Sequence, residues 1–401
     1  MTTSDRPSRR GAGQLRAELA KRVVVADGAM GTMLQASPVT LSDFDGHEGC
    51  NEVLNLTRPD VVRSIHDAYL AAGVDCITTN TFGANLGNLG EYGLQARIEE
   101  LSEAGARIAR EAADAASTGR RPRWVLGSVG PGTKLPTLGH VRFADLRDAY
   151  QRNVTGLLRG GVDAIVVETC QDLLQAKAAI IGARRAMAAD AIDIPLIAHV
   201  TIETTGSMLL GSEIGAALTA LEPLGISLIG LNCATGPGEM SEHLRYLAGH
   251  ATVPVSCMPN AGLPVLTGDG AHYPLTPGQL ADAHETFTAE FGLALVGGCC
   301  GTTPEHLATL VDRVRGGRSP PGGRGPSPAL PRSTSTCRSA RTPRSSPSAS
   351  GPTPKGRRRS ARRCSTAGST TASRSPGSRP ATGRTCSTCA WTTWAGTAAP
   401  T

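Results

Sequence analysis

The segment "LALVGGCCGTTPEHLATLVDRVRGG", residues 293 to 317, shows the pattern that recurs along this chain. It begins with a short apolar run, turns at two glycines, and continues as an amphipathic stretch of helical period that opens with Thr, Pro and Glu. An apolar run without polar alternation is typical of a strand that is buried on both faces, as in a parallel sheet. The segment therefore predicts one strand followed by one helix.

Seven further apolar runs have the same character, and helical segments separate them. The predicted strands are residues 23–29, 76–83, 124–131, 164–170, 195–202, 228–234, 253–260 and 293–300. Helices are predicted at 58–73 and 94–114, and others begin near Asp145, Asp172, Glu213, Met240, Thr276 and Thr303. Eight such units are typical of an α/β protein with a (β/α)8 TIM barrel. A doubly wound open sheet is the alternative, but the GxGxxG fingerprint is missing after the first strand.

Charge divides the chain into two parts near residue 316. Residues up to Arg315 include 25 Lys and Arg and 34 Asp and Glu, whereas the remainder has 15 Lys and Arg and no acidic residue. The later part consists mainly of Ser, Pro, Arg, Thr, Gly and Ala, from which an apolar core cannot be built. We predict a disordered amino terminus at 1–13, a barrel at 14–317 and a disordered basic tail at 318–401.

Two interpretations of the tail remain open. One is a Pro-rich linker followed by a basic arm that binds nucleic acid. The other, which we favour, is out-of-frame translation of a GC-rich gene, because a shifted reading of residues 354–397 restores helical apolar spacing. On this second interpretation the chain is truncated after its barrel, and no nucleic acid partner is expected.

The cysteines and the apolar segments indicate a compartment. The first residues contain no apolar signal region, and no run of 18 apolar residues occurs, so we expect a cytoplasmic protein without a membrane partner. Cysteines in a cytosolic chain of this size are more often buried, metal-bound or catalytic than bridged.

Three cysteines lie at predicted strand ends. Cys233 ends the sixth strand, and Cys299 and Cys300 end the eighth, between glycines that allow the backbone to turn. The carboxyl ends of all strands meet at one rim of a barrel, so the three thiols can converge there. Three thiolates with an open fourth position are the ligand pattern of a catalytic zinc site. The alternatives are isolated buried thiols, which we assign to Cys76, Cys170 and Cys257, or a vicinal disulfide.

Two carboxylates lie at other strand ends. Asp27 and Glu168 could bind the ammonium group of an amino acid, act as acid and base, or cap a helix. Glu168 is poorly placed as a cap because Asp172 follows it directly before the predicted helix. His199 lies inside an apolar strand, which favours a hydrogen-bonded core histidine over a ligand.

Six motifs resemble the homocysteine-binding barrel of cobalamin-dependent methionine synthases, within the homocysteine S-methyltransferase family. They are "DGAMGTMLQ", "TTNTFGAN", "VVETCQDLLQAKAAI", "GLNCATGP", "MPNAGLP" and "VGGCCGTTPEH". The resemblance extends from about residue 14 to about residue 317. It implies that the catalytic cysteines Cys233, Cys299 and Cys300 hold Zn2+, with the thiolate of homocysteine as fourth ligand.

The resemblance also implies the rest of the reaction. Asp27, Gly28, Glu168 and Asn232 are expected to bind homocysteine, and methylcobalamin, carried on a domain outside this chain, is the expected methyl donor. The partners would then be cobalamin-binding and folate-binding modules. A stand-alone methyltransferase using betaine or S-methylmethionine is an alternative, although 3% aromatic residues offer few cation–π partners for such a donor. A noncatalytic protein that binds zinc or homocysteine is the other.

Overall fold

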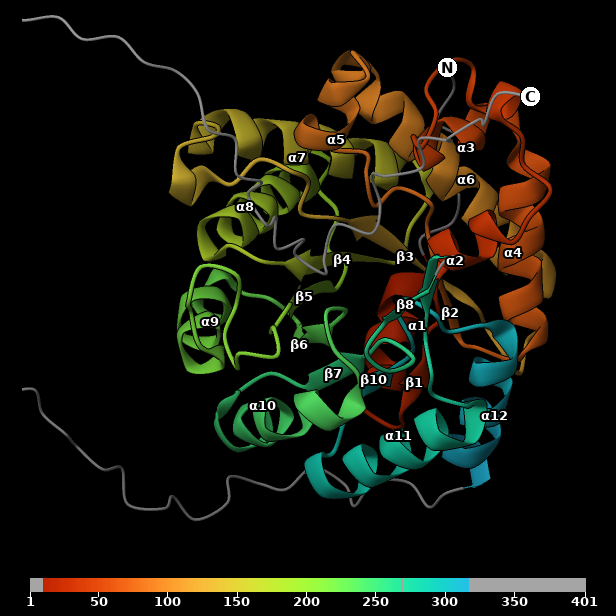
Figure 1. The fold of residues 1–401 in the computed structure, drawn as a ribbon, viewed down its shortest axis with the longest axis vertical. Helices are drawn as coiled ribbons and strands as arrows, with labels where there is room; N and C mark the ends of the chain where they lie inside the picture. The colour runs from red at the N-terminus through yellow and green to blue at the C-terminus, as the bar shows by residue number, and fades with distance from the viewer. Residues whose placement is uncertain (1–9, 268–269, 317–401) are drawn as a thin grey trace, which may run out of the picture. The chain divides into compact units, whose positions relative to one another are not determined.

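The computed structural model describes residues 10–267 and 270–316, which form a nearly closed barrel of eight parallel strands surrounded by helices (Figure 1). The barrel strands are β1 (Val24–Val25), β2 (Cys76–Thr78), β3 (Trp124–Val129), β4 (Ala164–Cys170), β5 (Leu196–Val200), β6 (Leu228–Asn232), β7 (Val255–Met258) and β10 (Leu295–Val296). Each lies within one of the eight predicted strand segments. The predicted (β/α)8 fold is therefore confirmed.

Several of the helices around the sheet begin at start signals in the sequence. They are α1 (Arg10–Leu19), α2 (Met30–Gln35), α3 (Leu54–Thr57), α4 (Pro59–Ala71), α5 (Leu86–Glu91), α6 (Ile98–Ala116), α7 (Phe143–Gly160), α8 (Leu173–Ala189), α9 (Ile214–Leu221), α10 (Pro237–His250), α11 (Pro277–Phe291) and α12 (Pro304–Gly316). The Asp172 carboxylate accepts a hydrogen bond from Leu174 N and so caps α8, as predicted. Thr276 and Gln279 form a capping box at the start of α11.

Two features of the structure were outside the sequence prediction. α1 begins at Arg10, within the segment expected to be disordered. The connection between β7 and α11 contains an antiparallel pair, β8 (Val265–Thr267) and β9 (Gly270–His272), that no pattern indicated. The predictions for residues 1–9 and for the tail at 318–401 lie outside the described residues.

Strand order distinguishes the barrel from an open sheet. The strands follow the order β1, β10, β7, β6, β5, β4, β3, β2. Barrel strands that are consecutive in the chain therefore pair with each other, except for β1 and β2. The last strand, β10, pairs with the first, β1. A doubly wound sheet would instead reverse its direction of growth at a switch point. The alternative fold is therefore excluded.

Side chains of the strands alternate between two apolar clusters, as the pleat of a strand requires. Val24 and Val166 belong to a cluster that also contains Leu15 and Leu19 of α1, whereas Val25 and Val167 belong to the larger cluster of strands and outer helices. The first cluster is the interior of the barrel. Because both strand faces are buried, the strands read as continuous apolar runs in the sequence.

One seam of the barrel has no strand ladder. β1 and β2 are not paired as strands, and the backbone–backbone hydrogen bond across the seam in this part of the described chain runs from Asp75 N to Val25 O, at 2.7 Å. Two side chains replace the missing ladder. The Asp75 carboxylate accepts from Val25 N at 3.0 Å, and the Asp27 carboxylate accepts from Thr78 N and Thr78 Oγ1, both at 2.7 Å. Carboxylates therefore close the barrel at both ends of this seam.

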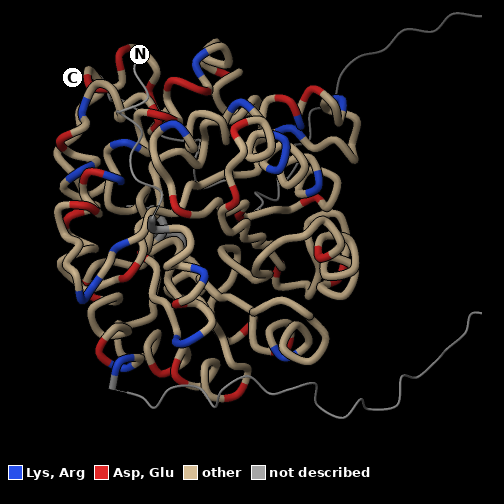
Figure 2. The backbone as a smooth tube through the Cα atoms, turned by 180° about the vertical axis from the view of Figure 1, so that it is seen from behind, with Lys and Arg blue, Asp and Glu red and all other residues tan. Residues whose placement is uncertain are grey.

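The outer surface of the described barrel carries charges of both signs. Figure 2 shows Lys and Arg mixed with Asp and Glu along the helices around the sheet. Among the described residues, no helix is both long enough and apolar enough to cross a membrane.

Candidate metal and substrate site

Three thiols meet at the carboxyl-terminal rim of the barrel. Cys233 directly follows β6, and Cys299 and Cys300 lie between β10 and α12. Their sulfur atoms all lie within 4.8 Å of one another, and the Sγ atoms of Cys233 and Cys300 are 3.8 Å apart. All three side chains are partly exposed, and none of the described cysteines is in a disulfide. The structure thus brings together the three cysteines that the sequence singled out; we refer to them as the cysteine cluster.

Backbone geometry at both contributing loops makes this convergence possible. Cys233 and Ala234 have φ values of 60° and 58°, a left-handed conformation that costs energy for residues other than glycine. Gly301 has φ +77°, and a Cβ there would overlap the Tyr273 ring. A Cβ at Gly298 would overlap the side chain of Thr302. The glycines around the vicinal thiols therefore serve the turn, as the sequence analysis assumed.

Neighbouring elements hold the turn in place. Cys299 N donates to Pro259 O at 2.8 Å, and Cys300 N donates to Asn260 Oδ1 at 3.1 Å. Gly301 N donates to Thr32 Oγ1 at 3.2 Å. The ordered segment after β1 and the segment after β7 thus both support the thiol turn.

The donor set fits a soft divalent metal ion. Two sulfurs bound to one tetrahedral zinc at about 2.3 Å lie roughly 3.8 Å apart, which is the separation observed between Cys233 and Cys300. Hydrogen bonds from the Cys233 and Cys299 thiols, opposed by burial and assisted by the Tyr273 hydroxyl, hold the pKa of Cys300 well below its usual value. Hydrogen bonds to the other two thiols raise the pKa of Cys299 well above its usual value, so the three thiols titrate together and not one by one.

A partly buried carboxylate lies beside the cluster. Glu168 in β4 accepts from Ser128 Oγ at 2.6 Å and from Asn232 Nδ2 at 3.1 Å. Burial raises its pKa to about 7, the Ser128 hydrogen bond opposes the rise, and the charge of Cys233 adds to it. Two neutral donors, a hydroxyl and an amide, thus orient the carboxylate.

The Asn232 side chain joins this carboxylate to the thiols. Its Nδ2 atom donates to Glu168 Oε2 and lies 3.8 Å from Cys299 Sγ, and its Oδ1 atom accepts from Thr169 N at 2.8 Å. Thr169 has φ 57°, so the backbone of β4 is bent at the point where it faces Asn232. One amide group therefore spans the region between the acid and the sulfur.

Asp27 occupies a different kind of position from Glu168. It is 2% exposed, and Thr78 satisfies both of its oxygens. Burial raises its pKa to about 7, against the hydrogen bonds from Thr78 and with a smaller contribution from the Glu168 charge. The adjacent Gly28 is partly exposed, and a Cβ there would overlap Thr302 Oγ1. The carboxylate therefore closes the seam, while the backbone after it reaches the rim.

Several residues of this region were not singled out from the sequence. Ser128 and Thr78 lie within apolar runs, where a hydroxyl gives no signal of its partner. Tyr273 follows β9, an element that the sequence did not predict. His199, by contrast, is buried and shares a 2.7 Å hydrogen bond with Ser256 Oγ, which confirms it as a core histidine.

Comparison with known proteins adds the family. Residues 24–314 match the homocysteine S-methyltransferase family. The chain belongs to this family. The enzyme class expected from the sequence, a methyltransferase, is thereby confirmed at the level of the family.

Similar curated proteins in the family are much longer. The methionine synthase of Mycobacterium tuberculosis is 64% identical over 296 residues, which cover 74% of this chain and 25% of that protein. The methionine synthase of Mycobacterium leprae is 61% identical over 309 residues, covering 76% of this chain and 26% of that protein. The chain therefore spans about a quarter of the length of these relatives.

A solved structure of the family confirms the fold. The metallated form of the homocysteine methyltransferase MmuM from Escherichia coli superposes with a TM-score of 0.60 at 24% identity, covering 75% of this chain and 99% of that chain. Its oxidised form gives a TM-score of 0.56 at 23% identity, covering 73% and 96%. At this level of identity the likeness concerns the fold alone.

Proposed function

We propose that the barrel binds zinc through Cys233, Cys299 and Cys300 and uses it to present homocysteine as a thiolate for methylation to methionine. The observation that carries this proposal is the convergence of three sulfurs within 4.8 Å at the rim where such barrels place their chemistry. Zinc held by these three thiolates would leave a fourth position, where coordination would lower the pKa of a substrate thiol so that its proton passes to solvent and a reactive thiolate remains.

The chain's own groups would hold the amino acid end of the substrate. Glu168 is fixed by Ser128 and Asn232 and retains lone pairs that can accept from an ammonium group. A cationic partner favours the ionised carboxylate and so offsets the rise in pKa caused by burial. Three carbons separate the sulfur and nitrogen of homocysteine. This span suits the separation between the Glu168 carboxylate and the Cys299 thiol, which both contact the Asn232 amide. We assign the backbone at Gly28, after Asp27, to the same pocket.

Positioning is the main contribution of these residues to the reaction. With the sulfur at the cysteine cluster and the ammonium at Glu168, the substrate is held at both ends, and only its approach to the methyl carbon remains to be set. The strained backbone at Thr169 and Cys233 supports this view, because strain of this kind collects where a site must be held in one geometry.

We propose methylcobalamin, carried by residues outside the barrel, as the methyl donor. Support comes from the curated relatives, which are methionine synthases about four times as long as the matched region. Donation by a small sulfonium or ammonium compound would need an aromatic cage, and the whole chain contains 3% aromatic residues.

Metal analysis tests the central claim. The purified chain should contain one zinc per molecule, and Cys233→Ala, Cys299→Ala and Cys300→Ala should each abolish stoichiometric binding. Cys257→Ala is the matched control, because Cys257 is a free and fully buried thiol in β7 outside the cluster. Full zinc content in all three variants would overturn the proposal. Transfer of a methyl group from added methylcobalamin to homocysteine then separates the enzyme from a noncatalytic binding protein.

A further inference from the structure

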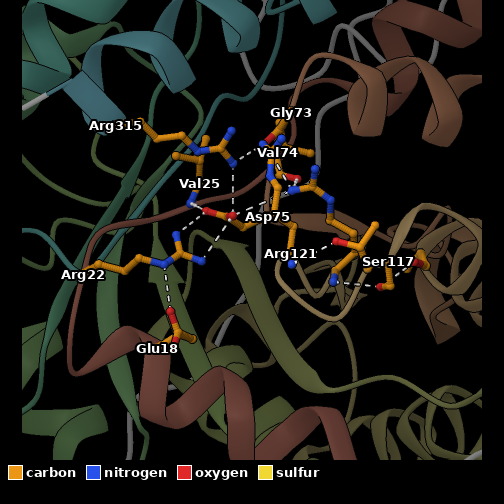
Figure 3. Close-up of polar contacts among 12 residues, drawn as sticks. Glu18, Arg22, Val25, Gly73, Val74, Asp75, Ser117, Arg121 and Arg315 are labelled. Carbon is orange, nitrogen blue, oxygen red and sulfur yellow. Dashed lines mark hydrogen bonds and ion pairs between the residues drawn. The ribbon is translucent and has the colours of Figure 1, made fainter.

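A group of arginines surrounds one carboxylate at the opposite end of the barrel (Figure 3). Arg22 precedes β1, Arg121 and Arg123 precede β3, and Arg315 lies in the last turn of α12. We refer to these four residues as the arginine cluster. Asp75, directly before β2, lies at its centre and is 4% exposed. This is the end at which strands begin, whereas the cysteine cluster lies where strands end.

The central carboxylate is shared among several donors. Arg22 donates to Asp75 through Nη1 at 2.7 Å and Nη2 at 3.2 Å, and Arg315 Nη2 donates at 3.3 Å. Arg123 Nη1 lies 3.7 Å from the same carboxylate. Val25 N is a further donor. One negative charge therefore faces three guanidinium groups.

Counting the partners shows an excess of positive charge. Glu18 accepts from Arg22 Nε at 2.8 Å, so this pair is neutral. In the described part of the chain, Arg123 and Arg315 form ion pairs with Asp75 alone, and Arg121 forms none. Arg121, Arg123 and Arg315 carry three positive charges, and Asp75 offsets one of them. About two positive charges therefore remain uncompensated.

Part of this charge is buried without sufficient acceptors. Arg123 is 7% exposed, and its Nη1 atom donates to Val74 O at 2.6 Å and to Gly73 O at 3.3 Å. Its Nε atom has no hydrogen-bond partner among residues 10–267 and 270–316. A guanidinium that is nearly buried with an unpaired N–H costs free energy unless an acceptor is supplied.

Two guanidiniums also approach the same point beside Gly73. Gly73 has φ +97°, and the position of a Cβ there is 3.3 Å from Val311 Cγ1, 3.4 Å from Arg315 Nη1 and 3.7 Å from Arg121 Nη2. The two guanidinium groups therefore reach one place from two separate elements, beside an apolar side chain of α12. Burial and the positive charge of Arg121 also lower the pKa values of Arg123 and Arg315, although Asp75 opposes this. The electrostatic field at the point therefore favours an anion.

We propose that Arg121, Arg123 and Arg315 form a binding site for a phosphate group, free or as a monoester, at the amino-terminal end of the barrel. Two excess positive charges match the charge of a phosphate dianion. Donors that come from two separate elements, the segment before β3 and α12, suit a tetrahedral group with three acceptor oxygens better than a planar carboxylate, and guanidinium forks bind phosphate oxygens well.

Titration of the full chain with inorganic phosphate tests the site, by calorimetry and thermal unfolding with chloride adjusted to keep ionic strength constant. We expect saturable binding of one phosphate per chain. Arg121→Gln should weaken it about tenfold or more, since one charge-assisted hydrogen bond is lost. Because Arg121 is exposed and forms no ion pair among the described residues, this variant should fold normally.

Matched variants complete the experiment. Arg142→Gln is the control, because Arg142 is exposed and pairs with Asp145. It should bind phosphate like the original chain, and Arg121→Lys should bind with intermediate affinity. Glycerol 3-phosphate as a second probe distinguishes the sources: equal affinity assigns the site to a phosphate monoester, and binding of inorganic phosphate alone assigns it to the free anion. No saturable binding beyond the chloride control, or equal binding by Arg121→Gln, would overturn the proposal.

Discussion

Asp27 and Asp75 perform the same task at the two ends of one seam, in opposite surroundings. Each carboxylate accepts from the backbone N–H of the other strand, Asp27 from Thr78 and Asp75 from Val25. Asp27 is otherwise bonded to a neutral hydroxyl, whereas Asp75 is surrounded by guanidiniums. An aspartate therefore bridges the seam between β1 and β2 at each end of the barrel. The surroundings of the two aspartates differ, because thiols gather at one end and guanidinium groups at the other.

The largest effect on stability is expected at the arginine-rich end. Asp75→Asn removes the carboxylate that, within the described part of the chain, pairs with the buried Arg123, and it should lower the free energy of unfolding by about 3 kcal/mol. Urea unfolding measures the loss. Asp145→Asn, at an exposed pair, is the control and should change little. Equal stability of Asp75→Asn and the original chain would contradict the assigned difference between the two ends.

Asp27→Asn should cost less and should depend on pH. Its amide leaves one donor from Thr78 without an acceptor, a loss of about 1–3 kcal/mol. The folded-state pKa of Asp27, about 7, lies above the ordinary value of 3.8, so the folded chain binds the proton more tightly and its stability falls as pH rises between these values. The variant lacks this dependence. Unfolding measured from pH 4 to pH 8 should show the cost of the substitution shrinking as pH rises, and a cost that grows with pH would disprove the assignment.

Gly301→Ala tests the turn at the thiol-rich end. Both the positive φ and the overlap with the Tyr273 ring should oppose the substitution, by about 2 kcal/mol or more in total. Gly139→Ala is a matched control, because Gly139 has nearly the same φ, +75°, with open space at its Cβ position. Stability and zinc content should fall further in the first variant, and identical behaviour of the pair would remove the role given to Tyr273.

The smallest effect is expected at an exposed ion pair outside both ends of the seam. Arg16 and Asp193 form a bidentate pair, but their side chains are 50% and 85% exposed. Arg16→Gln should therefore change the free energy of unfolding by about 0.5 kcal/mol or less. If Arg16→Gln lowered the free energy of unfolding as much as Asp75→Asn, the number of hydrogen bonds in an ion pair, and not its burial, would set the loss of stability.

Much of the architecture could be predicted because its signals are local. Parallel strands buried on both faces read as continuous apolar runs, and the start of α8 is encoded in Asp172 and that of α4 in Pro59. The ends of strands were harder to predict. Residues 23–29 were expected to form one strand, yet only Val24 and Val25 do, because β1 has a ladder on one side only and the Asp27 side chain replaces the other.

The residues of the candidate site also fall into two groups, those that could be identified from the sequence and those that could not. Cys233, Cys299 and Cys300 were identifiable because soft ligands at strand ends are unusual and the glycines beside them permit a turn. Ser128 and Thr78 were not, since a hydroxyl in an apolar run is equally compatible with a core position. The arginine cluster was also invisible, because Arg22, Arg123 and Arg315 belong to helices and loops far apart in the sequence.

The order of apolar runs and caps along the chain is enough to specify eight strand-and-helix units and the rim at which the three thiols gather, because each signal acts within a few residues. The partners of Asp27, Glu168 and Asp75 depend instead on how the barrel closes. Closure sets residues from distant units at hydrogen-bond distance, and a carboxylate's charge and contacts follow from those neighbours, so the surroundings of these acids exist only in the folded barrel.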